Sequence, residues 1–405
     1  MGRNGPNRWV VLGAAGALNA LVGAVYIWSI FNIPLMEARG WTPQQISLGY
    51  SLYILTEGMT GFFVGWLQRK VKPSTLTFCG GLLFSTGWFM AGIVQSPAQF
   101  FALFSIVGGL GSGALYNTAV STATRWFADK RGLANGICIG CTGLSPLLFA
   151  PLGNLLIENL GVSRSFNVCG IIFVVCVVVF SRLLQAPPEG WRYGEQAAIT
   201  PEMGMTPAQM VKTPVFVALW FMFVTSAAAG MMVIGHASSI GQEMAGLTTS
   251  QAAVQVAILA VGNFLGRIVF ATLSDRFGRF PLLVGIMAVT AVVMIFFFGA
   301  VRDFLTLTVA LCVVGACFGG VMSIMPALAA DLFGSKHFGQ NYALLFFGYS
   351  VASVIGPMLG AAMLENTGSY HAAFPAAGAL TCVGIALCLL SAVLAGRMQK
   401  RNRKG

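Results

Sequence analysis

Long apolar runs dominate this chain and restrict it to one class of protein. Twelve runs can be distinguished, each close to the ~20 residues that a helix needs to cross ~30 Å of hydrocarbon. Charged residues make up only 9% of the 405 residues, whereas a soluble domain carries roughly 25%. The runs do not alternate polar and apolar residues, as the strands of a membrane β-barrel would. The sequence therefore predicts an all-α polytopic membrane protein and excludes a soluble enzyme, a disordered chain and a disulfide scaffold.

Each apolar run predicts one membrane-spanning helix. The first run is too long for a cleavable signal peptide and has no small-residue cleavage site, so we expect it to remain as the first helix. The twelve predicted helices cover residues 9–34, 46–67, 75–94, 99–122, 132–157, 166–185, 215–239, 251–273, 281–300, 304–327, 338–364 and 372–395.

The positions of the basic residues predict the orientation of the chain. With the N-terminus on one side of the membrane, 19 of the 23 Lys and Arg residues fall on that same side. Only Arg39, Arg164 and Arg302 fall on the opposite side, and Arg267 lies inside a predicted helix. Loops rich in Lys and Arg stay in the cytoplasm. We therefore expect a multi-pass protein of the inner or plasma membrane with both termini cytoplasmic. The net charge of +11 then reflects topology, and we expect no nucleic-acid partner.

Comparison of the sequence with itself indicates an internal duplication. At an offset of 206 residues, four positions of the first half meet identical residues in the second: Phe127 and Phe333, Lys130 and Lys336, Asn135 and Asn341, Pro151 and Pro357. The only long polar connection lies at the midpoint and is rich in Pro. We expect an N-terminal six-helix half at 1–185, a cytoplasmic linker at 186–213, and a C-terminal six-helix half with a basic tail at 214–405.

Three motifs make the chain resemble a known family. The segment S-D-R-F-G-R (274–279) between the eighth and ninth predicted helices resembles the loop motif of the major facilitator superfamily. The stretch Y-N-T-A-V-S-T-A-T-R-W-F-A-D-K-R-G-L-A-N-G (116–136) and the segment N-F-L-G-R (263–267) are similar to its oxalate/formate antiporter and monocarboxylate transporter branch. The resemblance spans essentially the whole chain. It implies twelve helices in two pseudo-symmetric halves, with a substrate site near the midplane between the halves.

The loop motif also implies roles for particular charged residues. In this superfamily the loop holds neighbouring helices in one conformation. By resemblance, this gating role falls on Asp275, Arg276 and Arg279, and we group with them Asp129 and Arg131 of the F-A-D-K-R string.

Arg267 is the first of two formal charges near the centre of a predicted span. A charge at that depth costs about 2.5–3.5 kcal/mol even on the most lenient insertion scale, so it faces a cavity or a partner. Asn263 precedes Arg267 by four residues and therefore shares its helix face. The alternative partner, Asp275, lies eight residues on, about 12 Å along the axis. A guanidinium fork matches a carboxylate. The resemblance independently implies that Arg267, the arginine of the eighth predicted helix, is the ligand of the substrate carboxylate.

Glu57 is the second such charge, and the offset of 206 makes it the counterpart of Asn263. Such counterparts face one cavity from opposite halves. Burial favours the neutral form of a carboxyl group, which makes Glu57 a candidate for proton coupling, although a nearby Arg267 would favour the charged form. The alternative, a structural carboxyl group hydrogen-bonded between helices, stays open.

Aromatic residues supply further candidates. A tyrosine at membrane depth needs a hydrogen-bond partner, and an ordinary interhelical partner would serve. The resemblance implies that five aromatic residues line the substrate cavity: Tyr26, Tyr116, Phe318, Phe346 and Tyr349. Tyr349 stands where oxalate-exchanging members have a second cationic residue, a lysine.

These features predict a secondary transporter of small monocarboxylates such as lactate, pyruvate or formate, with a proton as the coupling ion. The alternative within the same class is an oxalate/formate-type anion exchanger. We do not expect an enzyme, because no cluster of His, Asp, Ser or Cys falls at one membrane depth. We expect no cofactor and no metal, and we expect a monomer in the lipid bilayer.

Overall fold

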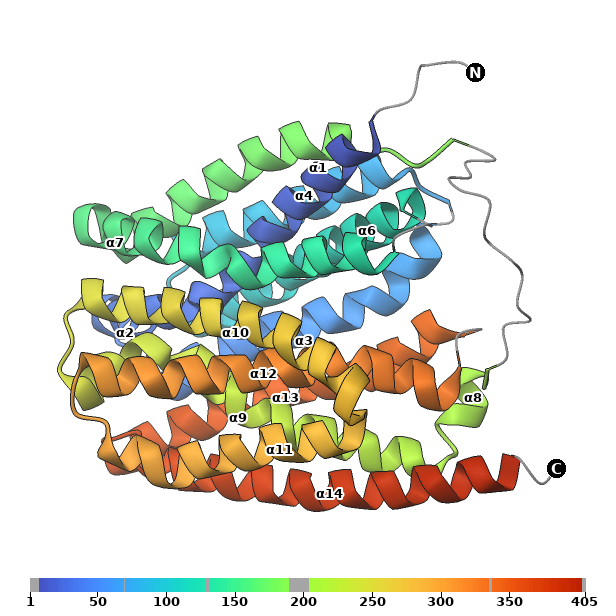
Figure 1. Cartoon of the computed structure of the whole chain (residues 1–405). Helices are drawn as coiled ribbons and strands as arrows, with labels where there is room; N and C mark the ends of the chain where they lie inside the picture. The colour runs from blue at the N-terminus through green and yellow to red at the C-terminus, as the bar shows by residue number, and fades with distance from the viewer. Residues whose placement is uncertain (1–6, 69, 128–130, 189–203, 335–336, 403–405) are drawn as a thin grey trace. The chain divides into compact units, whose positions relative to one another are not determined.

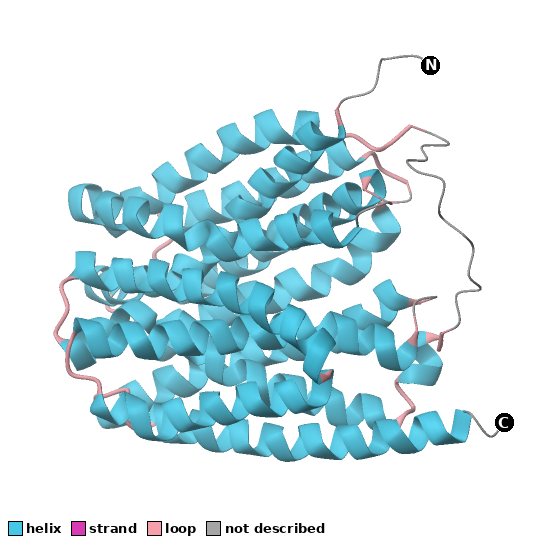
Figure 2. Ribbon diagram, in the orientation of Figure 1, coloured by secondary structure: helices cyan, strands magenta, loops and turns pink. Residues whose placement is uncertain are grey.

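The computed structural model describes residues 7–68, 70–127, 131–188, 204–334 and 337–402. Regular secondary structure in these residues is helical (Figure 2), apart from an isolated bridge between Gly204 and Gly334. The chain divides into two compact units, residues 1–199 and 200–405.

The N-terminal unit begins with three consecutive helical segments that together form one span. Its elements are α1 (Arg8–Val22), the 3₁₀ segment η1 (Gly23–Phe31), α2 (Asn32–Arg39), α3 (Pro43–Leu67), α4 (Pro73–Ala91), α5 (Pro97–Phe100), the π-helical segment η2 (Phe101–Gly108), α6 (Gly109–Trp126) and α7 (Arg131–Leu183) (Figure 1).

The C-terminal unit begins with a short helix that precedes its first span. Its elements are α8 (Pro207–Met210), α9 (Pro214–Ala245), α10 (Thr249–Phe277), α11 (Arg279–Val292), the π-helical segment η3 (Val293–Phe297), the 3₁₀ segment η4 (Phe298–Ala300), α12 (Phe304–Phe333), α13 (Phe338–Thr367) and α14 (Ala373–Asn402).

Twelve spans follow from these elements, as the sequence predicts. Nine helices in the described residues are long and apolar enough to cross a membrane. One of them, within α7, contains two spans that meet at Gly161, whose φ of 76° and ψ of 164° break the helix. The helices α3 and α4, which are less apolar, supply the remaining two. The predicted helices 132–157 and 166–185 leave residues 158–165 between them, but in the structure these residues continue the helices, and the chain turns at Gly161 alone.

The internal duplication is visible in the ends of the helices. Gly40 and Gly246, which are 206 residues apart, follow α2 and α9 with positive φ values of 66° and 61°. Each glycine supplies a left-handed backbone conformation that a side chain would disfavour. The next helix then starts in the same way in both units, because Thr42 with Gln45, and Thr248 with Gln251, exchange reciprocal capping hydrogen bonds.

The same offset governs how helices pack inside each unit. In the N-terminal unit, a Cβ atom added to Gly109 of α6 would lie 2.6 Å from the carbonyl oxygen of Tyr53 on α3. In the C-terminal unit, a Cβ atom added to Gly315 of α12 would lie 2.5 Å from the carbonyl oxygen of Leu259 on α10. Glycines therefore let α6 approach α3, and α12 approach α10, with backbone against backbone. The helices α10 and α12 run side by side over most of their length (Figure 1).

Substitution of Gly266 tests this close packing. A Cβ atom at Gly266 would overlap the carbonyl oxygen of Ala316 on α12. We expect Gly266→Val to lower the free energy of unfolding by about 1–3 kcal/mol or more, because neither backbone can move aside cheaply. Gly285→Ala is the matched control, since a Cβ atom there has no neighbour within 4 Å among the described residues; alanine should be neutral or slightly stabilising in this helix. Thermal unfolding in detergent measures both, and equal melting temperatures for the two variants would contradict the packing argument.

Candidate functional site

The central part of α10 carries the principal candidate residues. Asn263 is 3% exposed, and its backbone packs against the glycines of α12. A Cβ atom at Gly315 would lie 3.2 Å from the backbone nitrogen of Asn263. A Cβ atom at Gly319 would likewise lie 2.9 Å from the Asn263 Oδ1 atom. This packing fixes both the backbone and the side chain of Asn263 and so defines where its amide points.

Arg267 lies one turn further along α10 and is half-buried. Its Nε–H group donates a hydrogen bond to Asn263 Oδ1 over 2.9 Å. Among the described residues, its two terminal amino groups form no hydrogen bond and no ion pair. The guanidinium is thus oriented by one neutral group, while the end that suits a carboxylate has no protein partner there.

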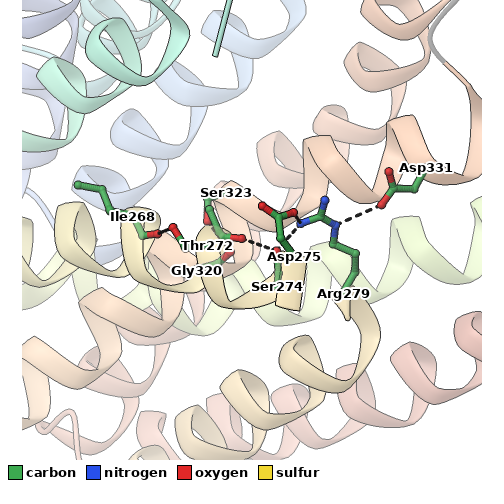
Figure 3. A network of polar contacts seen from close by, with 9 residues as sticks. Ile268, Thr272, Ser274, Asp275, Arg279, Gly320, Ser323 and Asp331 are labelled. Carbon is green, nitrogen blue, oxygen red and sulfur yellow. Dashed lines mark hydrogen bonds and ion pairs between the residues drawn. The ribbon is translucent and has the colours of Figure 1, made fainter. Parts of the chain in front are cut away.

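Asp275, the alternative partner for Arg267, has another partner. Its Oδ1 atom lies 2.6 Å from Arg279 Nη1, and Arg279 Nε lies 3.2 Å from Asp331 Oδ2 at the end of α12. The Arg279 guanidinium also donates to Ser274 Oγ. Figure 3 shows this network, which joins the end of α10, the start of α11 and the end of α12.

The other residues assigned to gating are less informative. Arg276 lies close to its neighbour Phe277, with the guanidinium carbon 5.9 Å from the ring centroid. Asp129 lies outside the described residues. Arg131 is the first residue of α7, and its side chain also lies outside the described part of the structure.

Three of the predicted aromatic residues come together in the C-terminal unit. The rings of Phe346 and Tyr349 stack with their centroids 4.9 Å apart, and the Phe318 ring lies 6.4 Å from that of Tyr349. Phe318 belongs to α12 and the other two to α13. Gly230 of α9 leaves the space that the Phe318 ring occupies, because a Cβ atom there would overlap it.

The remaining two aromatic candidates belong to the N-terminal unit. Tyr26 lies in the 3₁₀ segment η1 and Tyr116 in α6, and both are half-buried. Each has an interaction partner within the protein. Glu57 lies on α3 and is half-buried, next to Ser112 of α6 and to Tyr50 and Tyr53 of its own helix.

Sequence reasoning gave no role to Tyr53 and Ser112, although two signals were present. Tyr53 precedes Glu57 by four residues and so shares its helix face. Ser112 lies within the glycine-rich run 108–113, and two of those glycines contact the α3 backbone around Glu57. Small residues three and four positions apart indicate a close contact between helices. A polar residue within such a run, here Ser112, is then expected to lie at that contact.

His236 of α9 has a structural role that needs no substrate. It is 2% exposed, and its Nε2 atom lies 2.9 Å from the carbonyl oxygen of Pro357, which can only accept a hydrogen bond. The Nδ1 atom must then accept from the Tyr370 hydroxyl group 3.0 Å away. Burial raises the pKa of Tyr370, which follows α13, so this hydroxyl group stays protonated and able to donate.

Comparison with known proteins identifies the family. The profile of the Major Facilitator Superfamily matches residues 12–303 and also residues 257–405. The chain belongs to the Major Facilitator Superfamily. It is therefore a membrane transporter of the secondary type and not an enzyme.

Relatives within the superfamily include carriers named for carboxylates. The chain is 26% identical over 401 residues to the oxalate:formate antiporter of Oxalobacter formigenes, covering 98% of this chain and 94% of that one. It is 26% identical to the uncharacterised MFS-type transporter YhjX of Escherichia coli, with 86% of each chain covered. Monocarboxylate transporter 12 of Homo sapiens is 24% identical, with 80% of this chain and 67% of that one covered.

A solved structure supports the fold. The chain aligns with a bacterial homologue of the human lysosomal transporter Spinster at a TM-score of 0.73, with 13% identity and 96% of each chain covered. The predicted family and the all-helical fold are thus confirmed.

Proposed function

We propose that this transporter carries small monocarboxylates, of the lactate, pyruvate or formate type, together with a proton and by alternating access. The observation that carries the proposal is the state of Arg267: a cation at mid-helix, oriented by Asn263, whose terminal amino groups have no partner among the described residues. A guanidinium at this depth needs an anion to offset its desolvation, and a substrate carboxylate supplies one.

Further ligands are assigned by the resemblance to the monocarboxylate and oxalate/formate branch. We propose that Tyr26, Tyr116, Phe318, Phe346 and Tyr349 line the path of the substrate. Hydroxyl groups of tyrosines can donate to a carboxylate, and aromatic rings suit the short apolar part of a monocarboxylate. The distribution of 19 basic residues against three supports cytoplasmic termini in a cell membrane.

An oxalate/formate-type exchanger is the second candidate. Its support is the similarity to the oxalate:formate antiporter, which covers nearly the whole of both chains. The two candidates differ in coupling: a symporter moves a proton with its substrate, whereas an exchanger needs a second carboxylate on the opposite side.

Uptake by proteoliposomes separates the two. With labelled lactate, formate and oxalate, we expect monocarboxylate uptake to rise when the outside is acid, and to need no internal carboxylate. Glu57→Gln should weaken the dependence on the pH gradient more than it weakens binding, because the amide cannot exchange a proton. Oxalate uptake at least as fast as monocarboxylate uptake, with no response to the pH gradient and a requirement for internal substrate, would favour the exchanger.

A further inference from the structure

Buried polar groups gather beside Glu57 in the N-terminal unit. The Tyr53 hydroxyl group, the Ser112 hydroxyl group and the Trp88 indole N–H lie near one another but form no hydrogen bond of normal geometry with the described residues, and all three side chains are 0% exposed. A buried polar group without a partner costs about 1–3 kcal/mol. Buried polar groups in native proteins are almost always paired with protein groups or with ordered water.

These groups come from three helices: Tyr53 lies on α3, Trp88 on α4 and Ser112 on α6. Ser112 of α6 faces the Glu57 carboxyl group, and both Ser112 and Trp88 of α4 face the Tyr53 hydroxyl group. The rings of Tyr53 and Trp88 both pack against Phe104, with centroid distances of 5.0 and 5.6 Å.

Glycines create the space for this arrangement. A Cβ atom at Gly108 would lie 3.1 Å from the edge of the Tyr53 ring, and one at Gly113 would overlap the Glu57 carbonyl oxygen. The close approach of α6 to α3 therefore brings Ser112, which lies between these two glycines, up to the carboxyl group. The packing that holds the helices together is also what positions the polar groups.

The chemistry of the groups gives the series a direction. An indole N–H can only donate a hydrogen bond, whereas the hydroxyl groups of Tyr53 and Ser112 can donate and accept. If Trp88 donates to Tyr53, Tyr53 donates to Ser112, and Ser112 donates to Glu57, every hydrogen points toward the carboxylate. The other titratable groups near Glu57 are Tyr50 on its own helix and Tyr26, which neighbours Tyr50.

We propose that Trp88, Tyr53 and Ser112 form a directional hydrogen-bond chain, bridged by ordered water, that ends on Glu57 and stabilises its carboxylate form. When Glu57 releases its proton to water, the electron pair of the O–H bond stays on the carboxyl oxygen, which then accepts a hydrogen bond from the Ser112 hydroxyl group. Bridging water is the ligand that unpartnered polar groups of this kind bind in protein interiors. Tyr53 and Ser112 are thus positioning residues, and their importance to transport rests on the proposed proton coupling.

Removal of either hydroxyl group tests the chain. Without a donor the carboxylate is less stable, so Glu57 keeps its proton to higher pH. We expect Ser112→Ala to move the pH of half-maximal uptake upward by about one to two units, and Tyr53→Phe to move it in the same direction by less. Ser105→Ala is the matched control, because the buried Ser105 hydroxyl group already donates to the Gly49 carbonyl oxygen over 2.7 Å.

Infrared spectroscopy reads the protonation of Glu57 without transport. The carboxyl C=O band that disappears in Glu57→Gln is titrated with pH in detergent-purified protein, and its midpoint should move upward in Ser112→Ala and not in Ser105→Ala. A band midpoint that is the same in wild type, Ser112→Ala and Tyr53→Phe overturns the chain. A shifted midpoint in a protein whose uptake ignores the pH gradient overturns proton symport and leaves the chain standing.

Discussion

Carboxylate binding is expected to fall by roughly 100-fold or more in Arg267→Ala. The guanidinium is the only formal positive charge in the central part of a predicted span, and hydrogen bonds between charged groups at low dielectric are the strong ones. Two such bonds at about 1.5–3 kcal/mol each correspond to at least a hundredfold change in affinity. Binding of labelled lactate or formate to purified protein measures the loss.

Arg267→Lys should also bind the carboxylate much more weakly than wild type. This variant tests the geometry of the cation separately from its charge. Lysine keeps the cation but offers a point charge on a flexible stem, without the planar fork. It also has no Nε–H group in a position to donate to Asn263, so the orientation seen here over 2.9 Å is lost.

The control for both variants is Arg164→Ala, which removes an exposed arginine of α7. It should bind substrate like the wild type, and all variants should elute as folded protein with similar melting temperatures. A folded Arg267→Ala protein with near wild-type affinity would show that the carboxylate binds elsewhere.

Arg267 also illustrates how far sequence reasoning reached. Its depth in the membrane and its spacing from Asn263 followed from an apolar run and the helical period, because both are local properties. The hydrogen bond between the two residues is a contact across one turn, and it matches that spacing. Likewise, the twelve spans followed from hydropathy because a helix in lipid must satisfy all its own backbone groups.

Contacts between distant segments could not be read in this way. The ion pair of Arg279 with Asp331 joins residues 52 positions apart, and the polar groups around Glu57 come from α3, α4 and α6. Their meeting depends on the register of packed helices, which glycine contacts at Gly109 and Gly113 fix. The conformation of a single residue could not be predicted either: the turn between the fifth and sixth helices is made by the φ and ψ angles of Gly161 alone.

The number of charges near the substrate should decide between one carboxylate and two. An oxalate dianion in a low-dielectric site needs two compensating cations, because an unpaired buried charge costs several kcal/mol. This chain offers Arg267. By its resemblance to the oxalate/formate branch, Tyr349 stands where oxalate-exchanging members are expected to have a second cation, and its ring stacks on Phe346. In the proposed symport, a monoanion would neutralise Arg267 and a proton would neutralise Glu57, so neither formal charge near the centre of a predicted span would stay uncompensated. Wild-type protein should therefore prefer lactate or formate to oxalate.

Tyr349→Lys is expected to reverse that preference. The new ammonium group would start from the α13 position that is now 6% exposed and packed between aromatic rings. With two cations present, oxalate affinity should rise at least about tenfold relative to lactate, since one additional charged hydrogen bond contributes about 1.5–3 kcal/mol. Tyr349→Met is the matched control, because it also replaces the aromatic ring with an unbranched side chain but adds no charge. Competition of unlabelled oxalate against labelled lactate measures the ratio. If Lys and Met variants show the same ratio as each other, charge at this position does not set selectivity; if wild-type protein already binds oxalate as well as lactate, the single-cation argument fails and the exchanger becomes the better description.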